Sequence, residues 1–320
     1  MTGWIRAAVE SVRPGRAIES IERPAEGNRK ETAIVTVAGG ERLVVQRTED
    51  PDGLRTETRL AREIAARTTV PVPTVLEWGR IDGDDDRGRG EAYRVVEAVE
   101  GRNLHERFTA LSPAARRRIA GRFGRALAEI HGAFAFERFG PVVADAGESG
   151  GGGGLRAEGP ESWARWLDAY LREGVEALPE PFADLEAAIE ATIEEGPAAD
   201  PTPRLFPWDF RPGNAMLDRG EITAFLDWGD PLAAGAGLSV AKAEHLLADW
   251  YVDDATALKT AFRDGYAEIR PLPEVGRTER VAAVVDSAVD STGVVTRPGY
   301  PERTGAAAVE FHRRRLRSLL

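Results

Sequence analysis

The sequence predicts an α+β fold in two parts: a small antiparallel β-rich part with one helix, and a larger, mainly helical part with a short β-hairpin. β-branched segments separated by turn residues fill about the first hundred positions. From residue 112 onward, apolar residues recur at helical spacing, interrupted by the short apolar runs 215–217 and 222–226. We therefore expect two domains, a β-rich one at 1–98 and a mainly helical one at 99–320.

The composition is that of an ordinary globular protein and argues against several classes of function. The 320 residues are 42% hydrophobic and 30% charged, with a formal net charge of -11. This acidic balance repels phosphate backbones and anionic lipids, so we expect no nucleic-acid or membrane partner. The sequence has no cysteine, which excludes disulfides and cysteine nucleophiles. No apolar stretch has the length of a signal peptide or membrane span, and we expect a cytoplasmic protein.

A β-hairpin opens the predicted order of elements in the first domain. The segments 32–38 and 41–47 are rich in β-branched residues, and two glycines join them. Before them, the segment 22–31 combines the end of a strand with a turn that carries Gly27 and Asn28. Together with two later strands, these segments give the first domain five strands.

One helix is expected in this domain, over residues 56–67. Leu60, Ile64 and Ala65 form its apolar stripe, and the proline-rich stretch that follows ends it. The two remaining strands are expected at 74–79 and 91–99.

The second domain is expected to be helical. A helix over 112–132 has Ile119, Phe123, Leu127 and Ile130 at helical spacing. The glycine-rich stretch 144–159 is interpreted as a flexible surface loop. Further helices are expected at 161–174, 182–196, 239–254, 257–269, 279–289 and 305–320.

Three polar residues stand at the edges of apolar runs around the predicted hairpin. Asp209 and Asn214 lie in a loop broken by proline and glycine, and Asp227 ends the following apolar run. Burial of the apolar runs should bring these side chains to one cleft. Phosphoryl transfer needs such a set, with one carboxylate to orient the attacking hydroxyl and oxygen ligands to hold magnesium on a triphosphate. A purely structural turn is the alternative for each residue taken singly.

The segments PWDFRPGNAML and ITAFLDWGDP resemble the paired motifs of the aminoglycoside phosphotransferase and choline kinase family. The resemblance implies the two-lobed protein-kinase-like fold, with ATP and Mg²⁺ as cofactors and a small-molecule hydroxyl as acceptor. It assigns the catalytic base to Asp209 and the magnesium ligands to Asn214 and Asp227. It leaves the acceptor open, as a metabolite or an antibiotic-like compound.

Other segments resemble the nucleotide-binding lobe of this family, in the same order along the chain. The resemblance implies that Glu63 pairs with the basic residue that binds phosphate. That basic residue is Arg47, or Gln46 takes its position if the strand register differs by one, because only one of two neighbours can face the cleft. Adenine would lie at three residues of the segment that joins the lobes: Val96, Glu97 and Val99. Gly27 and Asn28 would belong to the loop over the phosphates.

The chain departs from the family pattern directly before the expected base. Pro207 and Trp208 stand where the family has His-Gly, whose histidine is generally a scaffold residue. This departure leaves a second hypothesis open, a nucleotide-binding regulator with the kinase fold and no activity. A protein kinase is disfavoured, because nothing resembles the activation segment that follows the magnesium-binding aspartate in those enzymes.

Overall fold

The computed structural model describes residues 3–24, 30–81, 90–145, 154–289, 295 and 303–320. Its contacts divide the chain into two units. Unit 1 contains residues 1–102, 143–156 and 215–230, and unit 2 contains 103–142, 157–214 and 231–320. The boundary after residue 98 that we expect between the two lobes stays a prediction. The contacts assign the later segments 143–156 and 215–230 to unit 1 together with residues 1–102.

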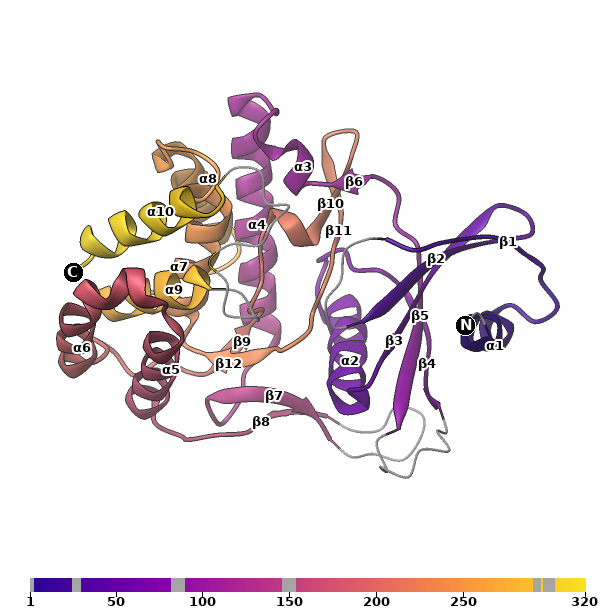
Figure 1. Cartoon of the computed structure of the whole chain (residues 1–320), viewed down its shortest axis with the longest axis horizontal. Coiled ribbons are helices and arrows are strands. Elements are labelled where there is room, and N and C mark those ends of the chain that lie inside the picture. Colours follow the sequence, from indigo (N-terminus) through magenta and orange to yellow (C-terminus); the bar gives the residue numbers. More distant parts are fainter. Residues whose placement is uncertain (1–2, 25–29, 82–89, 146–153, 290–294, 296–302) are drawn as a thin grey trace. The chain divides into compact units, whose positions relative to one another are not determined.

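A five-stranded antiparallel sheet forms the centre of unit 1, in the order β1-β2-β3-β5-β4 (Figure 1). The predicted hairpin is confirmed: β2 and β3 pair over their whole length, and the turn between them needs glycine because φ is +95° at Gly39 and +81° at Gly40. The strands are β1 (Ile18–Glu22), β2 (Glu31–Val37), β3 (Glu41–Thr48), β4 (Val75–Ile81) and β5 (Glu91–Glu97).

Two helices cover opposite faces of this sheet (Figure 1). Helix α1 (Gly3–Val12) was not expected from the sequence, although Ile5, Ala8 and Val9 have helical spacing. These three residues form one core with the inward side chains of the sheet. Helix α2 (Pro51–Arg67) covers the other face. The strand residues therefore point alternately to a face covered by α1 and to a face covered by α2.

Helix α2 begins five residues before the predicted start. Asp50 caps it, because its carboxylate accepts a hydrogen bond from the Gly53 amide at 2.9 Å, and proline follows at the first helical position. Leu60 and Ile64 are buried as expected. Ala65 is exposed, so its place on the apolar stripe was wrong; Ala61 is buried instead.

Unit 2 is mainly helical, as predicted. One of its hydrophobic core clusters includes Trp163 of α5 and Leu238 of α7, both fully buried. A π-helical turn at His245–Asp249 extends α7. The helices are α3 (His105–Phe108), α4 (Pro113–Ala133), α5 (Trp163–Ala177), α6 (Glu186–Glu195), α7 (Ala236–Glu244), α8 (Thr256–Ala267), α9 (Arg277–Ala288) and α10 (Ala306–Arg317).

A second antiparallel sheet contradicts the expectation that one hairpin alone interrupts the helices. Its order is β8-β7-β12-β9. The glycine-rich stretch 144–159 contributes to it at one end, and residues 146–153 of that stretch lie outside the described residues. The strands are β7 (Gly140–Ala144), β8 (Leu155–Ala157), β9 (Arg204–Phe206) and β12 (Leu232–Ala234).

The hairpin expected around residue 220 is present in unit 1. Strand β10 (Ala215–Asp218) pairs with β11 (Glu221–Phe225), and β6 (Arg102–Asn103) extends this sheet. Arg219 adopts a φ of +48° in the turn. The loop with the predicted base lies between β9 and β10, and Asp227 follows β11 by two residues.

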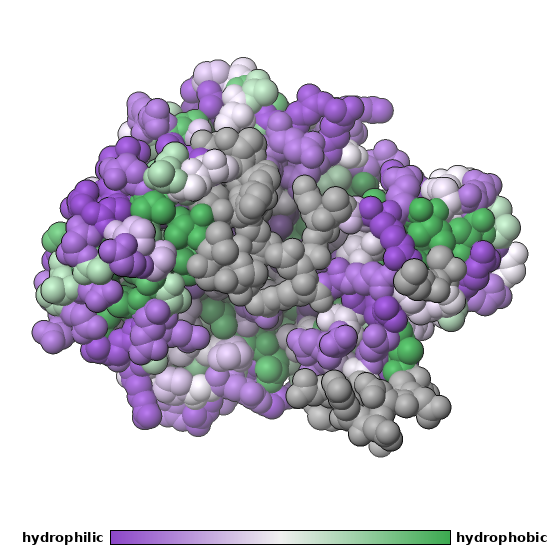
Figure 2. All heavy atoms as spheres, viewed as in Figure 1, coloured by the Kyte–Doolittle hydropathy of each residue, from purple (hydrophilic) through white to green (hydrophobic). Residues whose placement is uncertain are grey.

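The surface is largely hydrophilic on the face seen in Figure 2. Among the described residues, the exposed large hydrophobic side chains are Ile269 and Leu272. No helix in the described part of the chain is both long and apolar enough to cross a membrane.

We predict that Gly124→Ala destabilises the protein by at least about 2 kcal/mol. Helices α4 and α8 pack so closely that a Cβ at Gly124 would lie 1.9 Å from the Phe262 carbonyl oxygen and 2.8 Å from the Tyr266 amide nitrogen. The helices must therefore separate, and their buried contacts weaken. Urea unfolding measures the change.

Gly132→Ala is the matched control in the same helix. A Cβ there meets its nearest neighbour, an Arg270 nitrogen, at 3.9 Å. The change should leave stability unaltered or raise it by up to about 1 kcal/mol, because alanine favours a helix over glycine. Equal effects of the two substitutions would contradict the close helix contact.

Candidate active site

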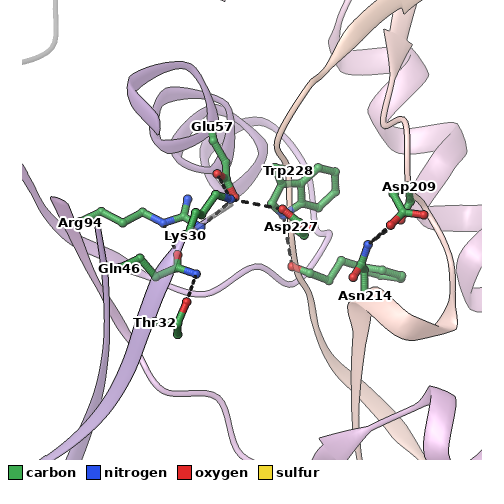
Figure 3. A network of polar contacts seen from close by, with 10 residues as sticks. Lys30, Thr32, Gln46, Glu57, Arg94, Asp209, Asn214, Asp227 and Trp228 are labelled. Carbon is green, nitrogen blue, oxygen red and sulfur yellow. Dashed lines mark hydrogen bonds and ion pairs between the residues drawn. The ribbon is translucent and has the colours of Figure 1, made fainter. Parts of the chain in front are cut away.

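Asp209 and Asn214 face each other across the loop that follows β9. The Asn214 side-chain nitrogen donates to the Asp209 carboxylate oxygen Oδ2 at 2.9 Å and to the Asp209 backbone carbonyl at 2.9 Å (Figure 3). The Arg211 Nε donates to the other carboxylate oxygen at 2.5 Å. Because the Asn214 side-chain nitrogen donates to Asp209, the Asn214 amide oxygen is directed away from that carboxylate and can act as a metal ligand.

This environment keeps the Asp209 carboxylate ionised. Burial opposes its charge, but the Arg211 guanidinium, the Lys242 ammonium and the Asn214 amide together hold the pKa of Asp209 below its ordinary value. The Asp209 side chain is 25% exposed to solvent. Asp209 is therefore a charged acceptor that a hydroxyl can reach.

Contacts within unit 2 fix the backbone of this loop. Phe210 is buried and packs edge-to-face against Phe123 of α4, with ring centroids 5.0 Å apart. The Asn103 side chain donates to the Gly213 carbonyl at 2.8 Å. A short 3₁₀ turn at Pro212–Asn214 completes the loop.

A buried ion-pair network occupies the α2 face of the sheet in unit 1. The Glu57 carboxylate, only 1% exposed, accepts from Lys30 Nζ and from the Arg94 guanidinium, the latter at 2.7 Å (Figure 3). Burial alone would raise the pKa of Glu57, but Arg94 and Lys30 bring it to about 2. Glu57 is therefore a fixed negative charge that holds two cations on this face.

Strand register decides between the alternatives Arg47 and Gln46. Gln46 lies opposite Thr32 and Arg94 in the neighbouring strands, donates to Thr32 at 3.2 Å and accepts from Arg94 at 2.7 Å. It therefore shares the face of Glu57. Arg47 points to the α1 face, where its guanidinium lies 5.1 Å from the centre of the Trp4 ring.

The expected pairing of Arg47 with Glu63 was wrong. Arg47 forms ion pairs with Glu31 at 2.7 Å and Glu91 at 3.0 Å. Glu63 pairs with Arg59 at 2.7 Å and with Arg67 at 3.8 Å, along its own helix.

The helical period explains why Glu57 takes the buried position. Glu57 follows the buried Leu54 by three residues and precedes Leu60 by three, so it lies on the stripe that faces the sheet. Glu63 is turned from that stripe and remains 25% exposed. The sequence contained this signal, but the predicted helix began only one residue before Glu57.

Asp227 differs from Glu57 in exposure and in backbone geometry. Its side chain is 54% exposed, and Lys30 Nζ lies 3.3 Å from one carboxylate oxygen. Its φ of +54° is uncommon for a residue with a side chain, and such backbone strain concentrates at functional sites. The next residue, Trp228, anchors the turn because it is buried and its indole donates to the Phe225 carbonyl at 3.2 Å.

The predicted site is thus distributed over the two units. Asp209 and Asn214 lie together in unit 2, and Asp227 lies beside Lys30 in unit 1. The meeting of all three around one nucleotide stays a prediction. Gly27 and Asn28 lie outside the described residues.

The segment expected to bind adenine begins at Val96, which belongs to an apolar row on the α2 face. Ile34, Val44 and Val96 lie opposite one another in three neighbouring strands, next to the polar row of Gln46. A pocket of about 270 Å³ lies at this end of unit 1, and both Glu97 and Val99 line it. The Glu97 amide donates to the Thr74 carbonyl at 3.0 Å, so its own carbonyl is the group that can serve a ligand.

Residues 20–275 match the sequence model of the phosphotransferase enzyme family, APH. The chain belongs to this family. The match covers most of both units and agrees with the resemblance of the motifs around Asp209 and Asp227. No curated protein sequence matches the chain significantly.

Solved structures share the fold, which is the protein-kinase-like fold of aminoglycoside phosphotransferases. One is a thermostable mutant of aminoglycoside phosphotransferase APH(4)-Ia in a ternary complex with AMP-PNP and hygromycin B. It matches with TM-score 0.64 and 15% identity, covering 100% of this chain and 98% of that one.

Two further structures agree. A putative aminoglycoside phosphotransferase from Ralstonia eutropha JMP134 has TM-score 0.63 and 18% identity, with 90% and 86% of the chains covered. The GDP and kanamycin complex of APH(2″)-IIIa has TM-score 0.59 and 15% identity, with 89% and 90% covered. At these identities the likeness concerns the fold.

We predict that Glu57→Gln destabilises this phosphotransferase by about 3 to 5 kcal/mol, because it leaves the Arg94 guanidinium buried without its carboxylate partner. Glu63→Gln, in the same helix, removes partly exposed pairs and should change stability by at most about 0.5 kcal/mol. Urea unfolding of both variants at neutral pH makes the comparison. Similar losses would show that Glu57 is no more important than a surface glutamate.

The stability difference between the native protein and Glu57→Gln should depend on pH. The folded pKa of Glu57, about 2, is below the ordinary value of 4.5, so its ion pairs contribute fully above pH 4.5 and are lost as pH falls toward 2. The stability gap between the native protein and Glu57→Gln should therefore narrow over this interval. Urea unfolding at stepped pH measures it, and a constant gap would contradict the depressed pKa.

Proposed function

We propose that the chain is an ATP- and Mg²⁺-dependent small-molecule kinase, which transfers the γ-phosphoryl group to a hydroxyl of a metabolite or antibiotic-like acceptor. The observation that carries this proposal is the Asp209 carboxylate, held ionised by Arg211 and Asn214 yet still reachable. Membership in the phosphotransferase family supports it. Phosphoryl transfer asks the protein mainly for positioning and charge, and this loop offers both.

Asp209 has the role of base in this reaction. Its carboxylate accepts the proton of the acceptor hydroxyl while the hydroxyl oxygen forms a bond to the γ-phosphorus. The bond from that phosphorus to the bridging oxygen breaks, and ADP leaves with the electron pair. Arg211 and Asn214 keep the carboxylate ionised and oriented before the transfer.

Asn214 and Asp227 have the oxygen donors that Mg²⁺ prefers, an amide oxygen and a carboxylate. The described residues include no group of three or more His, Cys, Asp or Glu side chains able to hold a metal. Two protein ligands suit Mg²⁺, because this ion usually takes its other ligands from phosphate and water. When bound, it would neutralise charge on the phosphates.

We assign the phosphate contact to Lys30, in place of Arg47. Lys30 Nζ already lies between the Glu57 and Asp227 carboxylates, and its side chain is 20% exposed. Glu57 serves as the anchor expected at Glu63. The apolar row of Ile34, Val44 and Val96 gives adenine a surface, and the Glu97 carbonyl and the Val99 backbone would take its polar edge.

We predict that Asp209→Asn lowers phosphoryl transfer by about 10² to 10⁴-fold, the usual contribution of a positioned base. The amide keeps the shape of the side chain but cannot accept the proton. Nucleotide binding, measured by calorimetry, should remain within about twofold, because Asp209 contacts the acceptor. Unchanged turnover would remove Asp209 from the mechanism.

A second prediction separates Lys30 from Arg47. Lys30→Met should weaken ATP binding by about tenfold or more, because a charge-assisted contact to phosphate is lost. Arg47→Met should leave affinity within about twofold, because Arg47 lies on the α1 face of the sheet. Calorimetric titration of folded protein measures both. A larger loss in the Arg47 variant would restore the assignment made from the sequence.

The acceptor can be identified by a nucleotide-consumption screen. Two of the related structures contain hygromycin B and kanamycin, respectively, and the panel should add amino alcohols and sugars to aminoglycosides. ATP and GTP should both be tested, with Asp227→Ala as the blank. Thermal stabilisation by nucleotide without transfer to any acceptor would favour the inactive regulator.

A further inference from the structure

Trp208, the residue before the proposed base, is held by an ion pair whose lysine is buried. Its indole nitrogen donates to an Asp286 carboxylate oxygen at 3.3 Å. The Lys242 Nζ lies 4.0 Å from the centre of the Trp208 ring and pairs with the other Asp286 oxygen. Trp208, Lys242 and Asp286 are called the Trp208 clamp below.

The two charged residues of the clamp belong to helices of the core. Lys242 lies in α7, in which every residue from Gly237 to Glu244 is buried, and its own side chain is 4% exposed. Asp286 lies in α9, whose residues Val281 to Val285 are buried. Residues of both helices belong to one buried hydrophobic cluster of unit 2. The clamp therefore ties the loop to buried helices of its unit.

A buried ammonium is costly unless its charge is compensated. Lys242 receives this compensation from the Asp286 carboxylate and from two aromatic rings, with Phe206 as the second at 5.6 Å. For Trp208 the result is contact at two points: the ring face meets the cation and the ring edge meets the carboxylate. Two such contacts fix the orientation of the ring, and with it the backbone that leads into Asp209.

We propose that Lys242 and Asp286 are positioning residues, which hold the Asp209 loop in place through Trp208. The inference rests on the proposed function of that loop. It also accounts for Pro207 and Trp208 directly before the proposed base: the fixation of this segment comes from helices α7 and α9.

The first test is hydrogen exchange of the loop, which needs no turnover. Lys242→Met keeps the length and apolar volume of the side chain but removes the charge. The amides of residues 208–211, 213 and 214 should then exchange about tenfold faster. Lys259→Met is the matched control. It also removes a lysine that pairs with an aspartate in unit 2, Asp249 at 2.8 Å, and should leave the loop protected.

Two outcomes would overturn the proposal. One is unchanged loop exchange in folded Lys242→Met, and the other is equal loop opening in Lys259→Met, which would reveal only a general loss of stability. Should Lys242→Met not fold, the double variant Lys242→Met with Asp286→Asn removes both charges and leaves no carboxylate uncompensated. Its loop should still exchange about tenfold faster, and a protected loop would again refute the clamp.

The second test uses ATP hydrolysis, with water as the acceptor. Lys242→Met should lower kcat by about tenfold or more with KM for ATP within about twofold, because a displaced base affects the reaction and leaves nucleotide contacts intact. Trp208→Phe keeps the ring face over the cation and should retain most of kcat, whereas Trp208→Ala should not. Equal kcat values for Trp208→Phe and Trp208→Ala would exclude the ring. If the native protein hydrolyses no ATP, an acceptor identified by the consumption screen replaces water in this test. If no acceptor is phosphorylated either, the proposed function fails, and loop exchange still tests the clamp.

Discussion

The ionised Glu57 carboxylate, buried between Lys30 and Arg94, is the constraint on which unit 1 depends. At 1% exposure it can keep its charge only because both cations contact it. Each partner comes from a different place in the fold: Lys30 precedes β2, Arg94 lies in β5, and Glu57 itself lies in α2. One charge thus fixes the helix on the sheet and directs Lys30 toward Asp227, which the proposed phosphate contact requires.

Exposure distinguishes the acids that hold structure from those available for chemistry. Glu57 is fully enclosed by its partners and has no capacity for a ligand. Asp227 is about half exposed, contacts Lys30 at its edge and has a strained backbone, so a cation could replace that contact at little cost. Asp209 is intermediate, ionised by its neighbours but open on one side. Partial exposure of a carboxylate, as in Asp209 and Asp227, therefore agrees better with a role in catalysis than a strongly lowered pKa does, as in Glu57.

Local patterns predicted what depends on local physics. The hairpin β2–β3 and helix α4 were confirmed because a glycine turn and apolar periodicity are each contained in one segment. The face of Arg47 was different: alternation states only that Arg47 and Gln46 point to opposite sides. The face to which each residue points depends on where α1 packs. This helix lies far from Arg47 along the chain and was not expected from the sequence. The assignment of the anchoring carboxylate to Glu63 failed for a related reason, since the Asp50 cap that starts α2 lay before the predicted helix.

The loop of Asp209 shows the same limit at the level of the site. Its motif indicated a base and a ligand, and the structure brings Asp209 and Asn214 into contact. Its position, however, comes from distant segments: β9 is three residues long and pairs with β12, where Leu205 lies opposite Ala233, and Arg204 also forms a bridge with Ala135. Trp208 adds contacts to α7 and α9. A strand so short has no periodicity to recognise, and a lysine on an apolar helix resembles a surface residue until its partner is known. Motifs can therefore indicate candidate reacting groups, while the residues that hold them in place become visible only once the chain is folded.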